Sequence, residues 1–257
     1  MIKTRKNYVY TGRKIGQILG INVTSTSLAE VLPRVEDFIA HSAKFYIVTP
    51  NPELILMSQH NLNLKEALNS ADLSVPDGVG LKIADPALTI IKGRELFLEL
   101  IKLAEKRSWK VFLLGGLGTE AAKAGSILKS QFPGVKIESD GGPKLGVNAE
   151  PMGINERKTE IKTVERINKF APQLLFIAFG NPKQEIWIHK NLSKLKIGGA
   201  MAVGGAFRYI AGITPLPPKW MAKAGLEWLW RLITEPSRLE RIFNAVFVFP
   251  LKVFFAG

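Results

Sequence analysis

The chain has 257 residues and no cysteine, which excludes a disulfide framework, a thiolate metal site and a cysteine nucleophile. A hydrophobic fraction of 46% argues against disorder and supplies a large core, and α/β folds of this length are common as single units. The formal net charge of +13 predicts an acidic partner, either nucleic acid, an anionic membrane surface or a phosphate-rich substrate.

No transmembrane or secretory segment is predicted. The basic N-terminal stretch MIKTRKNYVYTGRKIGQILG lacks the apolar region of a signal peptide. The longest apolar stretch, at 242–257, is shorter than the roughly 20 residues that cross a bilayer, and Asn244, Pro250 and Lys252 interrupt it. Such a segment could still lie on a membrane surface.

Six short apolar runs are predicted to be strands, and most are continuous, as is typical of strands covered on both faces. Patterns with helical periodicity lie between them. In chain order, strands are expected at 45–50, 73–76, 109–116, 135–139, 173–180 and 199–205, and helices at 52–71, 93–108, 120–132 and 157–171. This alternation predicts an α/β fold with a Rossmann-like, mostly parallel sheet and helices on both faces.

Two segments lack such periodicity. Residues 139–157 are rich in glycine and proline and are predicted to be a loop, and GITPLPPKW at 212–220 is predicted to be a linker. Beyond the linker the chain becomes aromatic and basic, with six Lys or Arg against three Glu in 219–257. We therefore expect an α/β body over residues 1–212 and a C-terminal helical appendage, facing a membrane, over residues 213–257.

Polar groups follow four of the predicted strands. They occur in TPNPE at 49–53, in PDG at 76–78, in FGNPKQEIW at 179–187 and in the glycine pair at 204–205. Each alone is ordinary capping or turn chemistry. Open α/β sheets, however, bind ligands at the carboxyl ends of their strands. Four polar strand ends at one sheet edge therefore predict a cleft, in which Asp77 could act as a general base.

The segment LLGGLGTEA at 113–121 leaves other functions open. Gly116, Gly118 and Ala121 match the G-x-G-x-x-A turn of dinucleotide folds, and Glu138 lies near the expected place of a ribose-binding acid. The alternatives are a nucleotide-binding oxidoreductase and a plain tight turn. The net charge also suggests a nucleic-acid-binding module, but no recognised motif supports one, so we expect no nucleic-acid partner.

The C-terminal part contains a possible arginine cluster. Arg231, Arg238 and Arg241 are spaced so that they share one helical face if the helix continues through Pro236. They form either a solvated basic face or a cluster that grips a diphosphate, because guanidinium groups match phosphate oxygens. The histidine spacing suggests no metal site and no catalytic triad.

Taken in order, several motifs resemble those of the WecG/TagA/CpsF glycosyltransferases. They are TPNPE, ADLSVPDGVGL, FLLGG, AFGNPKQEIWI, VGGAF and PPKWMAKAGLEWLWRLITEPSRLERI, and they run from about residue 17 to about residue 245. The resemblance implies an inverting enzyme that transfers an N-acetylmannosamine-type sugar from a UDP donor to N-acetylglucosamine on a polyprenyl diphosphate. It implies no metal or cofactor. It also implies a bacterial peripheral protein at the cytoplasmic membrane face, which can self-associate as a homo-oligomer and acts in teichoic acid, capsule or other exopolysaccharide synthesis.

The resemblance also implies roles for residues of this chain. Asp77 is the expected base, and Thr49, Asn51 and Gln184 are expected beside it in the catalytic pocket. The expected donor-binding residues are Gly115, Gly116, Gly180, Lys183, Gly204, Gly205 and Phe207. The expected contacts of the acceptor or of the leaving diphosphate are Arg231, Arg238 and Arg241.

Two positions depart from the family pattern. Ile90 stands where an arginine is expected, with Lys92 and Arg94 as candidate substitutes. Arg208 stands where an aspartate is common. The departure at Arg208 leaves the identity of the donor sugar open.

Overall fold

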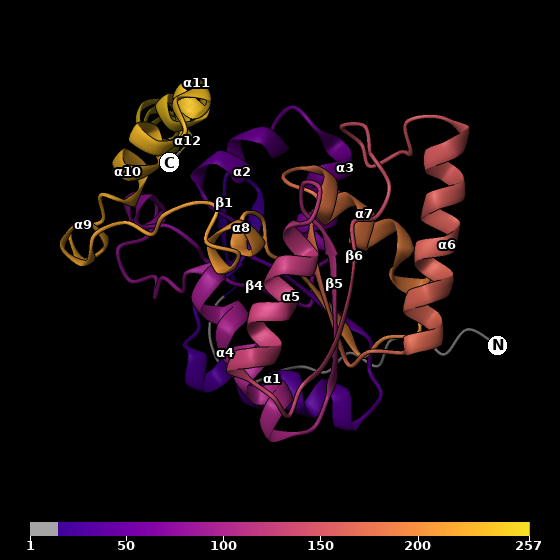
Figure 1. Cartoon of the computed structure of the whole chain (residues 1–257). Coiled ribbons are helices and arrows are strands. Elements are labelled where there is room, and N and C mark those ends of the chain that lie inside the picture. The colour runs from indigo at the N-terminus through magenta and orange to yellow at the C-terminus, as the bar shows by residue number, and fades with distance from the viewer. Residues whose placement is uncertain (1–14, 257) are drawn as a thin grey trace.

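Six parallel strands form the central sheet of the protein, and helices cover both of its faces (Figure 1). The computed structural model describes residues 15–256, so the stretch 1–14, in which we expect no signal peptide, lies outside the described residues. The strand order across the sheet is β4-β3-β8-β7-β5-β6. A two-stranded antiparallel hairpin, β1–β2, forms a separate sheet.

Strands and helices alternate along the body of the chain. The strands are β1 (Ile15–Ile18), β2 (Ile21–Thr24), β3 (Phe45–Val48), β4 (Leu73–Ser74), β5 (Lys110–Gly115), β6 (Lys136–Asp140), β7 (Leu174–Ala178) and β8 (Gly199–Ala202). The helices of the body are α1 (Leu28–Ala40), α2 (Pro52–Ser58), α3 (Leu62–Asn69), α4 (Gly93–Lys106), α5 (Glu120–Gln131), α6 (Ile154–Phe170), α7 (Lys183–Asn191) and α8 (Ala206–Ile210). The C-terminal helices are α9 (Lys219–Lys223), α10 (Glu227–Thr234), α11 (Leu239–Phe243) and α12 (Phe249–Ala256).

Alternate residues of the central strands enter two separate cores, one on each face of the sheet. In β7, Leu175 and Ile177 belong to the core under α2, α3 and α7. Leu174 and Phe176 belong to the core under α1, α4 and α5. Every residue of β7 is buried, which explains why its sequence is continuously apolar.

The predicted α/β fold and its six central strands are confirmed, but some details differ. The helix expected over 52–71 is divided into α2 and α3. The side chain of Asn61 accepts a hydrogen bond from the backbone N–H of Leu64 (3.0 Å) and begins the second helix. The hairpin β1–β2 and helix α1 were not predicted.

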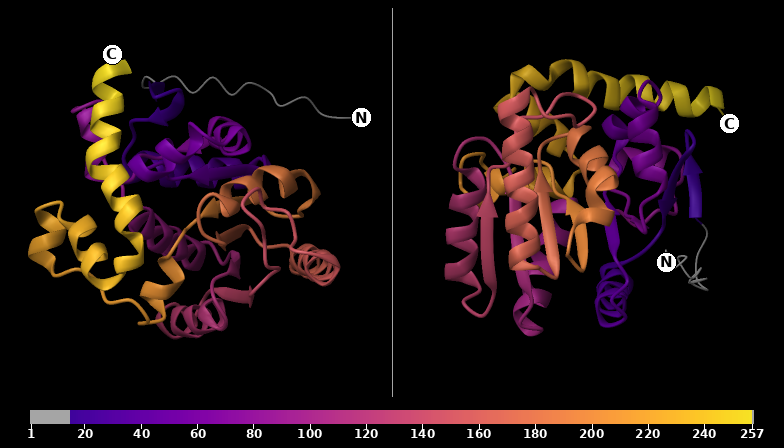
Figure 2. Two further views of the ribbon diagram at one scale, coloured as in Figure 1. Left: turned by 90° about the horizontal axis from the view of Figure 1, so that it is seen from above. Right: turned by 90° about the vertical axis from the view of Figure 1, so that its right-hand side faces the viewer.

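The C-terminal segment, which we define as residues 213–256, lies across the end of the sheet toward which the strands point (Figure 2). It is helical, and Phe249 is fully buried in the core that includes α2. Its outer surface exposes large apolar side chains, namely Leu239, Phe243, Phe247, Leu251, Phe254 and Phe255. Within the part of the chain that the structure describes, no helix is long and apolar enough to cross a membrane.

Candidate functional site

A cavity of about 310 Å³ opens at the carboxyl ends of β4, β3, β8 and β7, which are neighbours in the sheet. Loops and helix starts that follow these strands line it, together with part of the C-terminal segment. The lining residues are Thr49, Asn51, Glu53, Asp77, Gly93, Arg94, Phe179, Gly180, Asn181, Lys183, Gln184, Glu185, Val203, Gly204, Gly205, Ala206, Arg208, Tyr209, Thr214, Arg231, Glu235, Arg238 and Arg241. The structure thus brings together all the predicted site residues except Gly115, Gly116 and Phe207.

Asp77 lies where the turn after β4 meets the start of α4. The backbone N–H of Gly93, the first residue of α4, donates a hydrogen bond to the Asp77 carboxylate. A Cβ atom at Gly93 would lie 3.0 Å from Thr49 Oγ1 and 3.4 Å from Asp77 Oδ2, so glycine keeps both groups uncovered. The helix dipole of α4 also favours a negative charge at this point.

The protonation of Asp77 is shifted toward neutral pH. The pKa of Asp77 is raised from 3.8 to about 6, mainly by burial and to a smaller extent by the charge of Glu227. Arg231, the N–H of Gly93 and Arg94 act in the opposite direction, so burial is the dominant cause. A carboxylate with this pKa is ionised at pH 7 and is still a stronger base than an ordinary aspartate, which suits a general base.

Gln184 joins the turn after β7 to the turn after β8. Its Oε1 accepts a hydrogen bond from the backbone N–H of Gly204 (3.1 Å), and its Nε2 donates to Asn181 Oδ1 (2.7 Å) and Glu185 Oε1 (2.8 Å). Asn51 similarly accepts a hydrogen bond from a backbone N–H of α2 (2.8 Å). Both side chains therefore stabilise local structure and also line the cavity, so a structural role does not remove either of them from the candidate site.

Glu185 had no role in the sequence-based prediction, although it belongs to the PKQE motif. It is only 2% exposed, yet it lines the cavity. Burial raises the pKa of Glu185 from 4.5 to about 7; the hydrogen bond from Gln184 lowers it, and the charge of Glu53 raises it. An acidic residue directly before the apolar IWI run of α7 was the only signal that the sequence offered.

We predict that replacing Glu185 with glutamine makes the free energy of unfolding less dependent on pH. A carboxyl group whose pKa is higher in the folded state destabilises the fold once it ionises, so wild-type stability should fall as pH rises from about 4.5 to about 7. The part of this fall due to Glu185 is on the order of 3 kcal/mol and should disappear in Glu185→Gln. Urea unfolding of both proteins between about pH 5 and pH 8 tests this. Equal slopes in the two proteins would contradict it.

The three arginines of the C-terminal segment reach the cavity, but not from one helix. Helix α10 ends at Thr234, and Pro236 begins a 3₁₀ turn, so the condition for a shared helical face, a helix that continues through Pro236, is not met. Arg231 lies on α10, Arg238 on the 3₁₀ turn (Pro236–Arg238) and Arg241 on α11. The change of direction at the proline still leaves all three lining one cavity.

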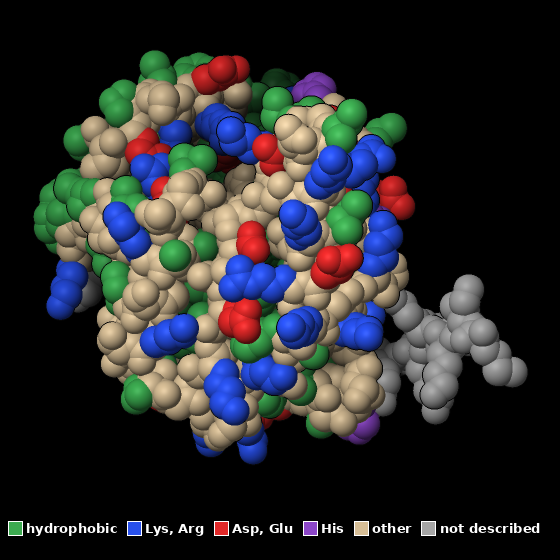
Figure 3. Space-filling model, turned by 45° about the vertical axis from the view of Figure 1, so that its right-hand side comes forward, with side chains coloured by type: hydrophobic (Ala, Val, Ile, Leu, Met, Phe, Trp, Pro, Cys, Tyr) green, Lys and Arg blue, Asp and Glu red, His purple; other side chains and the backbone are tan. Residues whose placement is uncertain are grey.

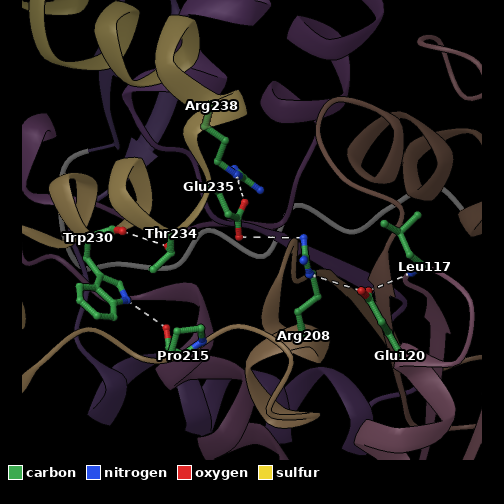
Figure 4. Close-up of polar contacts among 8 residues, drawn as sticks. All are labelled: Leu117, Glu120, Arg208, Pro215, Trp230, Thr234, Glu235 and Arg238. Atoms are coloured by element: carbon green, nitrogen blue, oxygen red, sulfur yellow. Dashed lines mark hydrogen bonds and ion pairs between the residues drawn. The ribbon is translucent and has the colours of Figure 1, made fainter.

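Arg208 connects α5 with the C-terminal segment at the cavity wall (Figure 4). Its Nε lies 3.4 Å from Glu120 Oε1, and its Nη1 lies 4.0 Å from Glu235 Oε1. Glu235 also pairs with Arg238. The guanidinium that stands at the usual aspartate position is therefore matched by two carboxylates.

Three predicted donor-binding residues lie outside the cavity lining: Gly115, Gly116 and Phe207. In the G-x-G-x-x-A turn, Glu120 Oε2 accepts a hydrogen bond from the Leu117 N–H (2.9 Å), and the Gly116 N–H donates to the Ala178 carbonyl (2.9 Å). Backbone groups that a phosphate would need are thus used within the protein. Phe207 is fully buried in the core.

The second departure from the family pattern is at Ile90. Of the two basic residues near it, Arg94 lines the cavity and Lys92 does not. Its guanidinium carbon lies 5.2 Å from the centre of the Tyr209 ring, and both residues line the cavity. Lys92 pairs with Glu227 (2.8 Å). Ile90 packs against the core.

Positive charge exceeds negative charge in the cavity lining. Six basic residues, counting Arg and Lys, line it against four Asp or Glu. On the face of the molecule in Figure 3, basic side chains are likewise more frequent, with acidic side chains between them. No group of three or more His, Asp or Glu side chains that could hold a metal ion occurs within residues 15–256. The cavity therefore suits an anionic ligand better than a cation.

Comparisons with known proteins agree with this arrangement. The family model described as glycosyl transferase WecG/TagA/CpsF matches residues 16–256. The chain is 29% identical over 245 residues to the N-acetylglucosaminyldiphosphoundecaprenol N-acetyl-beta-D-mannosaminyltransferase of Staphylococcus aureus strain MRSA252, covering 92% of this chain and 91% of the relative. It is 28% identical over 243 residues to the enzyme of the same name from strain NCTC 8325, with the same coverage. The chain therefore belongs to the WecG/TagA/CpsF family of glycosyltransferases.

Proposed function

We propose that this glycosyltransferase moves N-acetylmannosamine, or a closely related sugar, from a UDP donor to N-acetylglucosamine on a polyprenyl diphosphate. The names of the staphylococcal relatives support this pair of substrates. The observation in this chain that carries the proposal is the cavity at four strand ends, where Asp77 meets an excess of basic groups. No residue pair for hydride transfer was found in the sequence, and the family membership does not support the oxidoreductase alternative.

In the proposed mechanism, Asp77 accepts the proton of the acceptor hydroxyl as that oxygen attacks the anomeric carbon from the face opposite UDP. The bond to the UDP oxygen breaks, and negative charge develops on the leaving diphosphate. Arg231, Arg238 and Arg241 stabilise this charge, because preorganised cations act most strongly where charge develops. Gly180, Lys183, Gly204 and Gly205 contact the donor, and Thr49 orients the reacting groups beside Asp77.

We further propose that the C-terminal segment docks on an anionic membrane surface at the cytoplasmic face, where a polyprenyl-linked acceptor would be found. Its exposed Phe and Leu side chains, with Phe254 and Phe255 the most exposed, would enter the lipid interface. The net charge of +13 would strengthen binding to anionic lipid. Sedimentation with vesicles of anionic and neutral lipid tests this. A second copy of the chain that covered the same surface would instead appear as a dimer without vesicle binding.

The direct test of function is the release of UDP from UDP-N-acetylmannosamine, with and without a short-chain N-acetylglucosaminyl diphospholipid. We expect release that depends on the acceptor. Release only with another UDP-sugar would preserve the reaction type and change the donor. No release with any UDP-sugar would refute the proposed activity.

A further inference from the structure

Two buried side-chain atoms lack a hydrogen-bond partner in the part of the chain that the structure describes, and both belong to residues that line the cavity. They are Glu185 Oε2 and Arg208 Nε. The Arg208 atom still lies 3.4 Å from a carboxylate oxygen of Glu120. Because buried polar atoms are rarely left unpaired in native proteins, Oε2 of Glu185 is the atom to which a bound ligand can supply the missing partner.

The other contacts of Glu185 hold this oxygen in place. Its second oxygen, Oε1, accepts a hydrogen bond from Gln184 Nε2 (2.8 Å). Gln184 is in turn fixed by the backbone N–H of Gly204 (3.1 Å). The backbone of α7 begins only two residues earlier, at Lys183, so the carboxyl group is carried by a regular helix and not by a loop.

We propose that Glu185 is a substrate-binding residue whose Oε2 atom pairs with a hydroxyl group of a sugar bound in the cavity. This inference rests on the proposed function and adds to it a residue that selects for the substrate. The hydroxyl belongs either to the donor sugar or to the acceptor sugar.

A hydroxyl fits better than the other polar groups of the substrates. The pKa of about 7 means that Glu185 is present as both acid and carboxylate near neutral pH. A hydroxyl can donate to the carboxylate and accept from the acid. Oε1 already accepts from Gln184, so in the acid the proton lies on Oε2, where an amide N–H can no longer pair with it. A phosphate is repelled by the carboxylate. Of these three groups, a hydroxyl therefore suits Oε2 in both states.

The test uses Glu185→Met, which keeps the length of the side chain and removes its hydrogen bonds, and Glu185→Gln, which retains a hydrogen-bonding group. Each protein is assayed with donors and acceptors that each lack one sugar hydroxyl. We expect wild type to lose about tenfold or more in kcat/KM with one of these analogues, since a site built for a hydroxyl discriminates against its absence. With the complete substrates, the kcat/KM of Glu185→Met should be lower than that of wild type by a similar factor. With that analogue, the kcat/KM of Glu185→Met should not fall further. Glu185→Gln should recover part of the activity.

The identity of the analogue tells whether donor or acceptor supplies the hydroxyl. The inference fails if Glu185→Met keeps wild-type kcat/KM, or if wild type and variant discriminate equally against every analogue. Failure of the proposed function looks different, because wild type itself would then not turn over. If wild type does not turn over, the role of Glu185 is tested by calorimetric binding of the same UDP-sugars to wild type and Glu185→Met. Equal affinities of the two proteins for every sugar refute the proposed role.

Discussion

Replacing Asp77 with asparagine should lower kcat by about 10²- to 10⁴-fold, the range that a positioned general base contributes. Asparagine keeps the shape of the side chain but cannot take up the proton of the attacking hydroxyl. The amide can still accept the hydrogen bond from the N–H of Gly93, so α4 should begin as before. Acceptor-dependent UDP release measures the loss. Calorimetry with UDP should give an affinity close to that of wild type.

The matched control is Asp85→Asn, the same substitution at an exposed residue that does not line the cavity. It should leave kcat unchanged within about twofold, as surface substitutions usually do. Wild-type turnover by Asp77→Asn would show that another group accepts the proton. A loss of UDP binding equal to the loss of kcat would show that Asp77 acts in binding and not in proton transfer.

The sequence predicts the part of the candidate site that is formed by residues at the ends of strands. Parallel strands all place their carboxyl ends at one sheet edge, so Thr49, Asp77 and Gln184 could be placed together once the strands were recognised. The strands were recognisable because they are buried on both faces and hence continuously apolar. Strand order was not needed for this inference, and the sequence did not provide it.

Other features depend on side-chain contacts that local patterns do not encode. The G-x-G-x-x-A turn looked open to a phosphate, but Glu120 folds back from the next turn of chain and occupies the Leu117 N–H. The arginines would share one helical face only in a helix that continued through Pro236, whereas the helix ends before this residue. The local pattern assigned no role to Glu185, and only the packing of α7 shows that it is buried. In each case a specific contact, the packing of a helix or a change of direction outweighs the local pattern.

Replacing Arg231 with methionine should both slow the reaction and shift its pH dependence. The loss of one cation at the leaving diphosphate should reduce kcat/KM by about 10²-fold or more. Arg231 also lowers the pKa of Asp77, so its removal should raise that pKa above its present value of about 6. Asp77 must be ionised to act as a base, and activity therefore rises with pH through its pKa. The acidic limb of the kcat/KM profile should accordingly move to higher pH in Arg231→Met.

Glu227→Gln is the control, because it should shift the pKa of Asp77 in the opposite direction. Glu227 raises the pKa of Asp77 and does not line the main cavity, so its removal should move the acidic limb to lower pH while most of the activity remains. Glu185 also titrates near neutral pH, but among charged and polar neighbours its pKa depends on Gln184 and Glu53 and not on Arg231 or Glu227. If the acidic limb moves in opposite directions in the two variants, the limb therefore reports on Asp77. Shifts in the same direction, or none in either variant, would mean that the limb belongs to another group. Arg231 would then be a ligand of the diphosphate without influence on the base.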